Sequence, residues 1–252
     1  MYVDSHCHLD FPEFTEQRPA LLQRMAANDV GHALCVSVNL ADFPGVLALA
    51  ESDARLFASV GVHPDYPDVD EPTVERLVEL AGHPKIVAVG ETGLDYFRLT
   101  GDLEWQRERF RTHIRAARSC GKPLIIHTRA SADDTIRIMK EEGAGEVGGV
   151  MHCFTEGWET ARAAMDLGFH ISFSGIVTFK NAQSLRDVAA KIPDDRLLIE
   201  TDAPYLAPVP FRGRTNEPSF VRHVAEGLAV VRATRPDLIG DRTTDNFFNL
   251  FK

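Results

Sequence analysis

The chain has 252 residues, of which 44% are hydrophobic and 25% are charged, and its formal net charge is −10. These values are typical of a globular protein with a normal hydrophobic core, and the length predicts a single domain over residues 1–252. No apolar run approaches the roughly 20 residues needed to cross a bilayer, so we expect no membrane association. The acidic balance excludes a non-specific nucleic-acid binder, but not an enzyme whose positive potential is confined to its cleft.

The N-terminus and the cysteines bear on the compartment. No basic segment followed by an apolar stretch is present at the start of the chain, which favours the cytoplasm. The four cysteines form no Cys-x-x-Cys pair, so we expect free thiols with packing roles. Nothing in the sequence predicts an obligatory protein partner.

Strand-like and helix-like segments alternate along the chain. Eight short runs rich in branched and apolar residues predict strands at Tyr2–Asp4, Ala33–Val38, Leu56–Val60, Ile86–Val89, Pro123–Ile126, Gly149–Met151, His170–Phe173 and Arg196–Ile199. Helical spacing predicts helices at Ala20–Asn28, Phe43–Ser52, Thr73–Ala81, Leu103–Ser119, Ser131–Glu142, Trp158–Leu167, Asn181–Lys191, Ser219–Arg232 and Thr244–Phe251. This alternation indicates an α/β protein with parallel strands, and eight repeats predict a closed (β/α)8 TIM barrel. We expect the last helix to pack its phenylalanines against the barrel wall.

The motif His6-Cys7-His8 lies at the end of the first predicted strand. Alternate side chains of a strand share a face, so His6 and His8 should point the same way, together with Asp4. Two imidazoles on one face can bind one metal ion. Taken alone, the motif is more often a surface or structural pair of histidines than a metal site, so the metal interpretation depends on further ligands.

Further polar side chains follow the predicted strands at equivalent positions. They are His63, Glu91, His127, His152, Glu200 and Asp202. In a barrel the carboxyl ends of all strands meet at one face, which is where active sites of this fold lie. We therefore expect these side chains to converge with His6 and His8.

Imidazole and carboxylate ligands without thiolate favour divalent cations such as Zn, Mg or Mn. Six residues form the predicted ligand set: His6, His8, Glu91, His127, His152 and Asp202. Six ligands exceed the need of one tetrahedral ion, so we expect two ions that share Glu91. One ion would bind His6, His8, Glu91 and Asp202, and the other would bind Glu91, His127 and His152. Asp202 would also accept the proton of the attacking water as general base.

Seven motifs together resemble the TatD-type metal-dependent deoxyribonucleases, which belong to the amidohydrolase-like barrel hydrolases. They are Asp4-Ser-His-Cys-His-Leu9, Gly61-Val-His-Pro64, Gly90-Glu-Thr-Gly-Leu-Asp95, His127-Thr-Arg129, His152-Cys-Phe154, Glu200-Thr-Asp-Ala-Pro-Tyr205 and Arg212-Gly-Arg-Thr-Asn-Glu-Pro218. The resemblance runs in order over nearly the whole chain. It implies a divalent-metal hydrolase acting on DNA, commonly as an exonuclease on single strands from the 3′ end, and it supports the same six ligands.

Two residues near the predicted ligands have supporting roles in this interpretation. His63 would bind a phosphate oxygen or assist the leaving group, although a turn histidine held by Pro64 is an equal alternative. Glu200 would orient a ligating histidine, a role that overlaps with that of a buried structural carboxylate.

Basic and aromatic residues beside the predicted site are candidates for substrate binding. Arg129 would clamp a phosphate, with an ion pair to Asp133 or Asp134 as the alternative. Arg212 and Arg214, in the long loop after the last strand, would contact the nucleic-acid backbone. Tyr96 and Phe97 would stack a base or simply pack as part of a lid.

Three other functions fit parts of the pattern. A barrel enzyme of the same class could hydrolyse a small-molecule ester, lactone or amide, but Glu91 stands where many such enzymes have a modified lysine. A D-aminoacyl-tRNA deacylase is a second hydrolytic alternative. A non-catalytic scaffold is disfavoured, because such a protein would be expected to have lost ligands.

Overall fold

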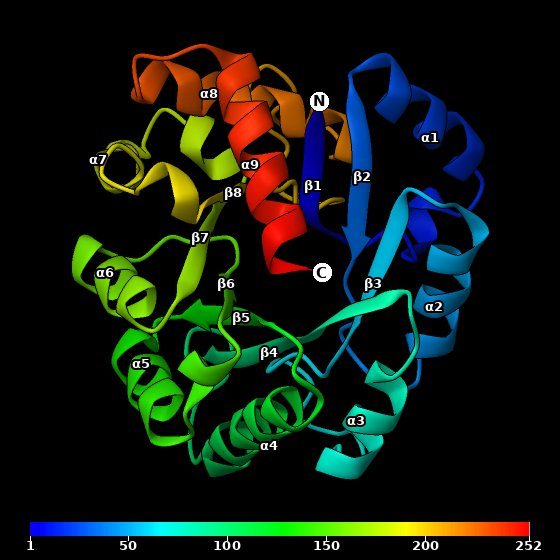
Figure 1. Cartoon of the computed structure of the whole chain (residues 1–252), viewed down its shortest axis with the longest axis vertical. Coiled ribbons are helices and arrows are strands. Elements are labelled where there is room, and N and C mark those ends of the chain that lie inside the picture. The colour runs from blue at the N-terminus through cyan, green and yellow to red at the C-terminus, as the bar shows by residue number, and fades with distance from the viewer. Residues whose placement is uncertain (252) are drawn as a thin grey trace.

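Eight parallel strands form one sheet in the order of the chain (Figure 1). The computed structural model describes residues 1–251. The strands are β1 (Tyr2–Cys7), β2 (Val30–Cys35), β3 (Leu56–Val60), β4 (Ile86–Asp95), β5 (Leu124–Arg129), β6 (Gly149–Met151), β7 (Phe169–Phe173) and β8 (Leu197–Ile199). A bridge between Cys7 and Ala203 brings the end of β8 back to β1. The predicted TIM barrel is confirmed.

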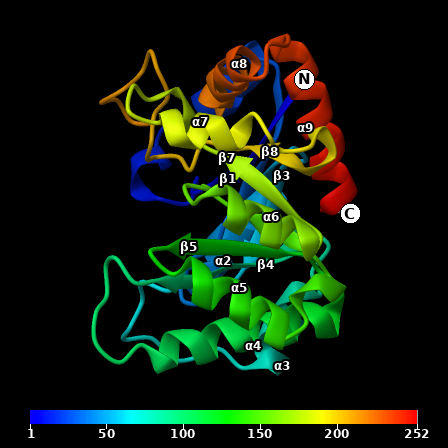
Figure 2. The same ribbon diagram turned by 90° about the vertical axis from the view of Figure 1, so that its left-hand side faces the viewer.

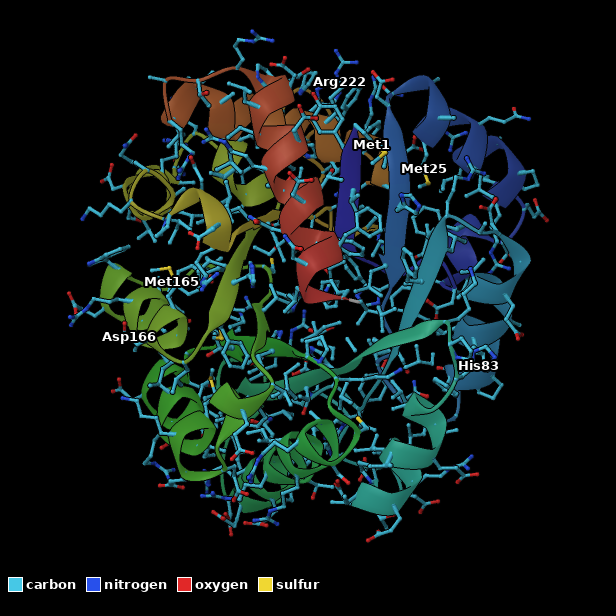
Figure 3. The ribbon with its side chains drawn as sticks, in the orientation of Figure 1. Met1, Met25, His83, Met165, Asp166 and Arg222 are labelled. Carbon is cyan, nitrogen blue, oxygen red and sulfur yellow. The ribbon has the colours of Figure 1, made fainter. Side chains whose placement is uncertain are left out.

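Helices cover the outside of this barrel. They are α1 (Arg18–Ala27), α2 (Phe43–Ser52), α3 (Val74–Ala81), α4 (Glu104–Cys120), α5 (Ala132–Glu141), α6 (Trp158–Asp166), α7 (Gln183–Ala189), α8 (Val221–Val231) and α9 (Pro236–Leu250). Each outer helix packs an apolar stripe on the strands and leaves its polar face to solvent. In α4, for example, Phe110 and Ile114 are buried, whereas the labelled Asp166 of α6 points away from the barrel in Figure 3.

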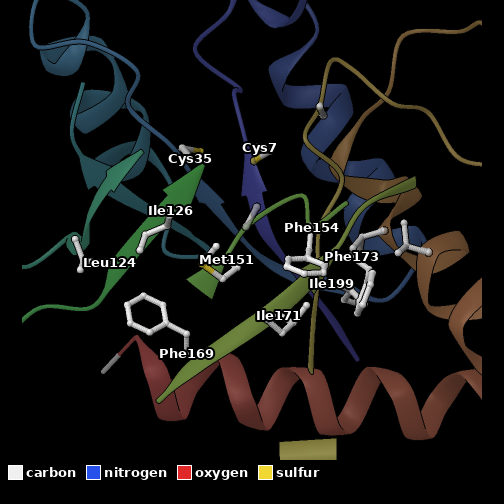
Figure 4. Packing of buried hydrophobic residues seen from close by; sticks show 14 of the residues in the cluster. Cys7, Cys35, Leu124, Ile126, Met151, Phe154, Phe169, Ile171, Phe173 and Ile199 are labelled. Atoms are coloured by element: carbon white, nitrogen blue, oxygen red, sulfur yellow. The ribbon is translucent and has the colours of Figure 1, made fainter. Parts of the chain in front are cut away.

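The strands contribute to two separate apolar layers because successive side chains alternate. The larger cluster lies between strands and helices, and Phe154, Phe173 and Ile199 gather in it (Figure 4). The smaller cluster fills the barrel interior and includes Val36 and Ile125. A filled interior means that the barrel has no open pore.

Helix α9 closes the amino-terminal end of the barrel. Its Phe247 and Phe251 belong to the interior cluster, and α9 lies on the side away from the long loops that follow β4 and β8 (Figure 2). The expectation of a short helix at Thr244–Phe251 was wrong in extent and in place. The helix begins at Pro236, a residue suited to a first helical turn, and it packs on the barrel end instead of the outer wall.

Three strands that carry predicted ligands, β1, β4 and β5, extend further than expected at their carboxyl ends. β4 was predicted to end at Val89 but continues to Asp95, so Glu91 lies within the strand. Gly90 and Gly93 within this strand allow a close backbone approach: Gly93 has φ +131°, and a Cβ there would collide with the carbonyl oxygen of His127. None of the described helices is both long enough and apolar enough to span a membrane.

Candidate metal centre

A cavity of about 570 Å³ opens at the carboxyl ends of the strands, opposite α9. Its lining includes six of the predicted site histidines and acids: His8, His63, Glu91, His127, His152 and Asp202. Cys153 also lines it, so the expected packing role away from the histidines was wrong. Its left-handed backbone, with φ +42°, breaks the strand alternation on which that expectation depended.

The first group of polar atoms surrounds the Nε2 atom of His6. This atom lies 3.3 Å from Nε2 of His8, 3.3 Å from Oε2 of Glu91 and 3.8 Å from Oδ1 of Asp202. His8 Nε2 is 3.5 Å from the same Asp202 oxygen. The structure therefore brings together the four residues that were predicted to share one ion.

The second group surrounds the other carboxylate oxygen of Glu91. Oε1 lies 2.7 Å from Nε2 of His152, 3.2 Å from Nδ1 of His127 and 3.2 Å from Nε2 of His63. Glu91 thus turns one oxygen towards each group, and His63 contacts it on the same side as His127 and His152.

Hydrogen bonds fix the orientation of three of these rings. In His8, Nδ1 faces the Val36 carbonyl oxygen at 3.0 Å. In His127 and His152, the nitrogen remote from Glu91 faces a carboxylate: Asp95 at 3.1 Å and Glu200 at 3.3 Å, respectively. An acceptor at the remote nitrogen holds the proton there and leaves the inner nitrogen free to bind a metal ion.

His63 has the opposite arrangement. Its remote Nδ1 accepts a hydrogen bond from the backbone N–H of Asp65 at 3.0 Å, so the neutral ring carries its proton on Nε2, which points into the site. Burial lowers the pKa of His63, which favours that neutral ring. To bind a metal ion through Nε2 while Nδ1 accepts this hydrogen bond, the ring would have to carry no proton on either nitrogen. The geometry therefore favours a hydrogen-bond donor at this position.

The buried charges at the centre reinforce one another. Burial would raise the pKa of Glu91, but the neighbouring imidazoles, above all those of His152 and His63, outweigh it and hold this pKa well below its usual range. Burial likewise opposes protonation of His152, but Glu91 and Glu200 raise its pKa well above its usual value. Glu91 and His152 thus stabilise each other's charged forms.

Asp202 is positioned by buried contacts on both sides. It has a left-handed backbone with φ +57°, which is costly for a residue other than glycine. Before it, Asp4 accepts hydrogen bonds from the backbone N–H and the hydroxyl of Thr201 at 2.9 and 2.5 Å. After it, the amide of Asn216 donates to the carbonyl oxygens of Thr201 and Tyr205 at 2.8 and 2.6 Å.

The sequence analysis misjudged three residues that support the site. Asp4 was expected beside the imidazoles but does not join them, because its carboxylate binds Thr201. Asp95 and Asn216 were quoted only as parts of motifs. Burial would raise the pKa of Asp95, but hydrogen bonds from His127 and from backbone amides lower it to about 2. In the sequence, only the position of this carboxylate four residues after Glu91 could have indicated that Asp95 orients His127.

The predicted substrate-binding arginines separate into two sets. Arg129 lines the cavity, as does Arg98, which the sequence analysis missed. Arg212 and Arg214 do not line it: their guanidinium groups lie 3.6 and 5.8 Å from the ring centres of Phe179 and Phe211.

The donor set suits a divalent cation. In the part of the chain that the structure describes, three groups have ligand atoms that all lie within 4.8 Å of one another: His6–His152–Asp202, His6–His8–Glu91 and His63–Glu91–His127. Buried imidazoles and carboxylates with oriented rings are typical of catalytic zinc, manganese or iron sites. The fold and this site together define a barrel hydrolase that depends on a metal ion.

Comparison with known proteins identifies the family. Residues 3–252 match the family described as TatD related DNase. The metal-dependent hydrolase YcfH of Escherichia coli K12 is 46% identical over 252 residues, covering 99% of this chain and 95% of that protein. YabD of Bacillus subtilis, also named a metal-dependent hydrolase, is 40% identical and covers 100% and 99%, respectively.

A solved structure agrees with the sequence comparisons. The TatD homologue YJJV of Escherichia coli K12 superposes with a TM-score of 0.92 at 34% identity, covering 99% of this chain and 97% of that one. The chain belongs to the TatD family and is a metal-dependent hydrolase.

Proposed function

We propose that this protein is a deoxyribonuclease that hydrolyses phosphodiester bonds with two divalent metal ions, Zn, Mg or Mn. Its substrate is single-stranded DNA, from which it removes nucleotides as a 3′–5′ exonuclease. The family described as TatD related DNase supports a DNA substrate.

The position of Glu91 is the observation that carries the proposal. Its two carboxylate oxygens face two different groups of ligand atoms, His6 on one side and His127 with His152 on the other. A carboxylate placed in this way is suited to bridging two ions. When bound, two ions would stabilise the attacking and leaving oxygens of a phosphodiester and lower the pKa of a water molecule.

Two residues are placed to move or hold protons. Asp202 is only 16% exposed and reaches the cavity, so its carboxylate can accept a proton from the attacking water. His63 directs its Nε2 proton inward and can donate it to a phosphate oxygen or to the leaving group. The base thus comes from the segment after β8 and the acid from the segment after β3, two different parts of the rim.

Glu200 and Arg129 assist without taking part in proton transfer. Glu200 is fully buried, and its Oε1 receives the backbone N–H of Cys153 at 2.8 Å while it faces His152. It therefore acts as a positioning residue. Arg129, on the cavity wall, offers a planar fork of donors that matches a phosphate group. Arg212 and Arg214 lie off the cavity and would contact only a more distant part of a strand.

The test is to incubate the metal-stripped protein with end-labelled single-stranded DNA and added Zn, Mg or Mn, in parallel with a panel of lactones and amides. We expect DNA to shorten from its 3′ end only when metal is present, and metal analysis to give two ions per chain. Glu91→Ala is the matched control and should be inactive. Turnover of a lactone with intact DNA would refute the proposal.

A further inference from the structure

The cavity has chemically different walls on opposite sides of the barrel. Phe11 follows β1 and Tyr205 follows β8, and these strands are neighbours. Arg98 follows β4 and Arg129 ends β5, which are also neighbours. Because the strands run in order around the barrel, the strand ends that carry these two pairs are half a circumference apart. An aromatic wall of Phe11 and Tyr205 therefore stands across the barrel mouth from the strand end that carries Arg129. The side chain of Arg98 lies near enough to Tyr205 for the two groups to interact electrostatically.

The aromatic wall is rigid and accessible. The ring of Phe11 stacks on the imidazole of His8, with 4.9 Å between centres and 19° between planes. Tyr205 meets Phe11 edge-on at 6.3 Å and 78°. The Tyr205 backbone is held by its N–H bond to the Asp202 carbonyl oxygen at 2.9 Å and by the Asn216 amide. Tyr205 is nevertheless 54% exposed, so a large aromatic surface is presented to the cavity by a fixed backbone.

The cationic wall is organised around Arg129. Its guanidinium lies 4.1 Å from the ring centre of Phe97, which orients the planar group. Within residues 1–251 that guanidinium forms no ion pair and donates no hydrogen bond to protein. The alternative of an ion pair to Asp133 or Asp134 is not found among these residues, and Asp134 is occupied by Tyr96 and Arg137. Its donors are therefore free for a ligand.

Arg98 extends this wall towards solvent. Its side chain is 60% exposed and is held by Asp65 at 2.5 Å. The stacking of Arg129 on Phe97 also has a consequence for base recognition. Since Arg129 covers one face of that ring, Phe97 supports the cationic wall, and the Tyr205 ring beside Phe11 is a second aromatic surface that a base can reach.

Building on the proposed nuclease activity, we infer that the cavity binds DNA in one fixed direction across the barrel mouth. The base of a nucleotide beside the cleaved bond stacks on the wall formed by Phe11 and Tyr205, and the next phosphate along the strand binds Arg129. The cleaved phosphodiester then lies over the ligand cluster between the two walls. The protein therefore recognises the end of the strand partly by stacking on a base, and it does so for any of the four bases.

A cycle of protein and substrate changes tests this assignment. Single-stranded oligonucleotides carry a tetrahydrofuran abasic residue at the last or at the next-to-last position, and kcat/KM is compared with that for the unmodified strand. Stacking of one base is worth a loss of about 5- to 100-fold. We expect the wild-type protein to show this loss for at least one of the two positions. Tyr205→Ala should lower kcat/KM on the unmodified strand to a similar extent and show no further loss on the abasic strand.

Two variants serve as controls. Tyr205→Phe keeps the ring and should restore the discrimination between normal and abasic strands. Phe97→Ala removes the ring that orients Arg129. It should therefore weaken binding of both strands by the same factor and leave the ratio of their kcat/KM values unchanged. An unchanged ratio in Tyr205→Ala, with DNA still cleaved, would overturn the stacking wall and leave the proposed nuclease intact. Failure of the wild-type protein to cleave any DNA would overturn both.

Discussion

Asp95 offers a sharp test of how the second ligand group is built, because Asp95→Asn changes hydrogen-bond chemistry without changing shape. One oxygen of Asp95 accepts the backbone N–H groups of Phe97 and Arg98 at 2.9 and 2.8 Å. The other faces Nε2 of His127 at 3.1 Å. In the variant the amide oxygen must stay with the two backbone donors, so the NH₂ group turns towards His127.

This reversal acts on the tautomer of His127. Facing an NH₂ donor, Nε2 has to become the acceptor, and the ring proton moves to Nδ1, which lies 3.2 Å from Glu91. A protonated Nδ1 cannot bind a metal ion. Loss of such an orienting partner typically lowers metal affinity by about 10- to 100-fold, equivalent to about 1.4–2.7 kcal/mol.

Metal affinity would be measured on the stripped protein by competition of Zn or Mn with a fluorescent chelator. Asp134→Asn is the matched control, since this residue also accepts a hydrogen bond, from Tyr96, but has no contact with a candidate ligand. Thermal unfolding without metal checks that both variants fold. Wild-type metal affinity in Asp95→Asn would refute the assignment of His127 as a ligand through Nδ1.

Three further predictions concern the site and the fold. Glu91→Ala or Asp202→Ala should abolish turnover yet leave the unfolding temperature of the metal-free protein within a few degrees of wild type; retained activity with metal supplied would contradict their roles. Arg129→Ala should reduce the dependence of log Kd for DNA on log salt concentration by about 1, which binding titrations at several salt concentrations would detect, whereas Arg212→Ala should change it less. Burial lowers the pKa of His113 to about 4. Below about pH 6.5 the unfolded chain therefore binds a proton that the folded chain does not. The free energy of unfolding should consequently fall by up to about 3 kcal/mol between pH 6.5 and 4. Denaturant unfolding of metal-free His113→Gln should show a smaller fall over that range, and an equal fall would argue against this contribution.

The barrel was predictable because each repeat carries its own local signals. Runs such as Leu56–Val60 are apolar, short and separated by segments of helical spacing, and their positions agree with the structure. The convergence of the six candidate ligands was predictable for the same reason, since each of them comes at or soon after the end of an apolar run. What failed was the extent of β4, which continues through Gly90 and Gly93, where the missing side chains allow close packing between strands.

The partners of the ligands could not be predicted from local patterns. Asn216 contacts Thr201 and Tyr205 across 15 and 11 positions of the chain, through a loop whose path no periodicity describes. The arginines show the same limitation. Arg98 and Arg212 are equally plausible in sequence, and only the course of two loops places one beside the cavity and the other against Phe179.

Because α9 blocks the amino-terminal end of the barrel, it also determines how substrate and product can enter and leave. Phe247 and Phe251 pack among the interior side chains, so no ligand can pass through the barrel from one end to the other. A molecule that enters the cavity must therefore leave through the same opening. A long polymer would therefore present one tip at a time, and each released fragment would have to vacate the entrance before the shortened tip could advance.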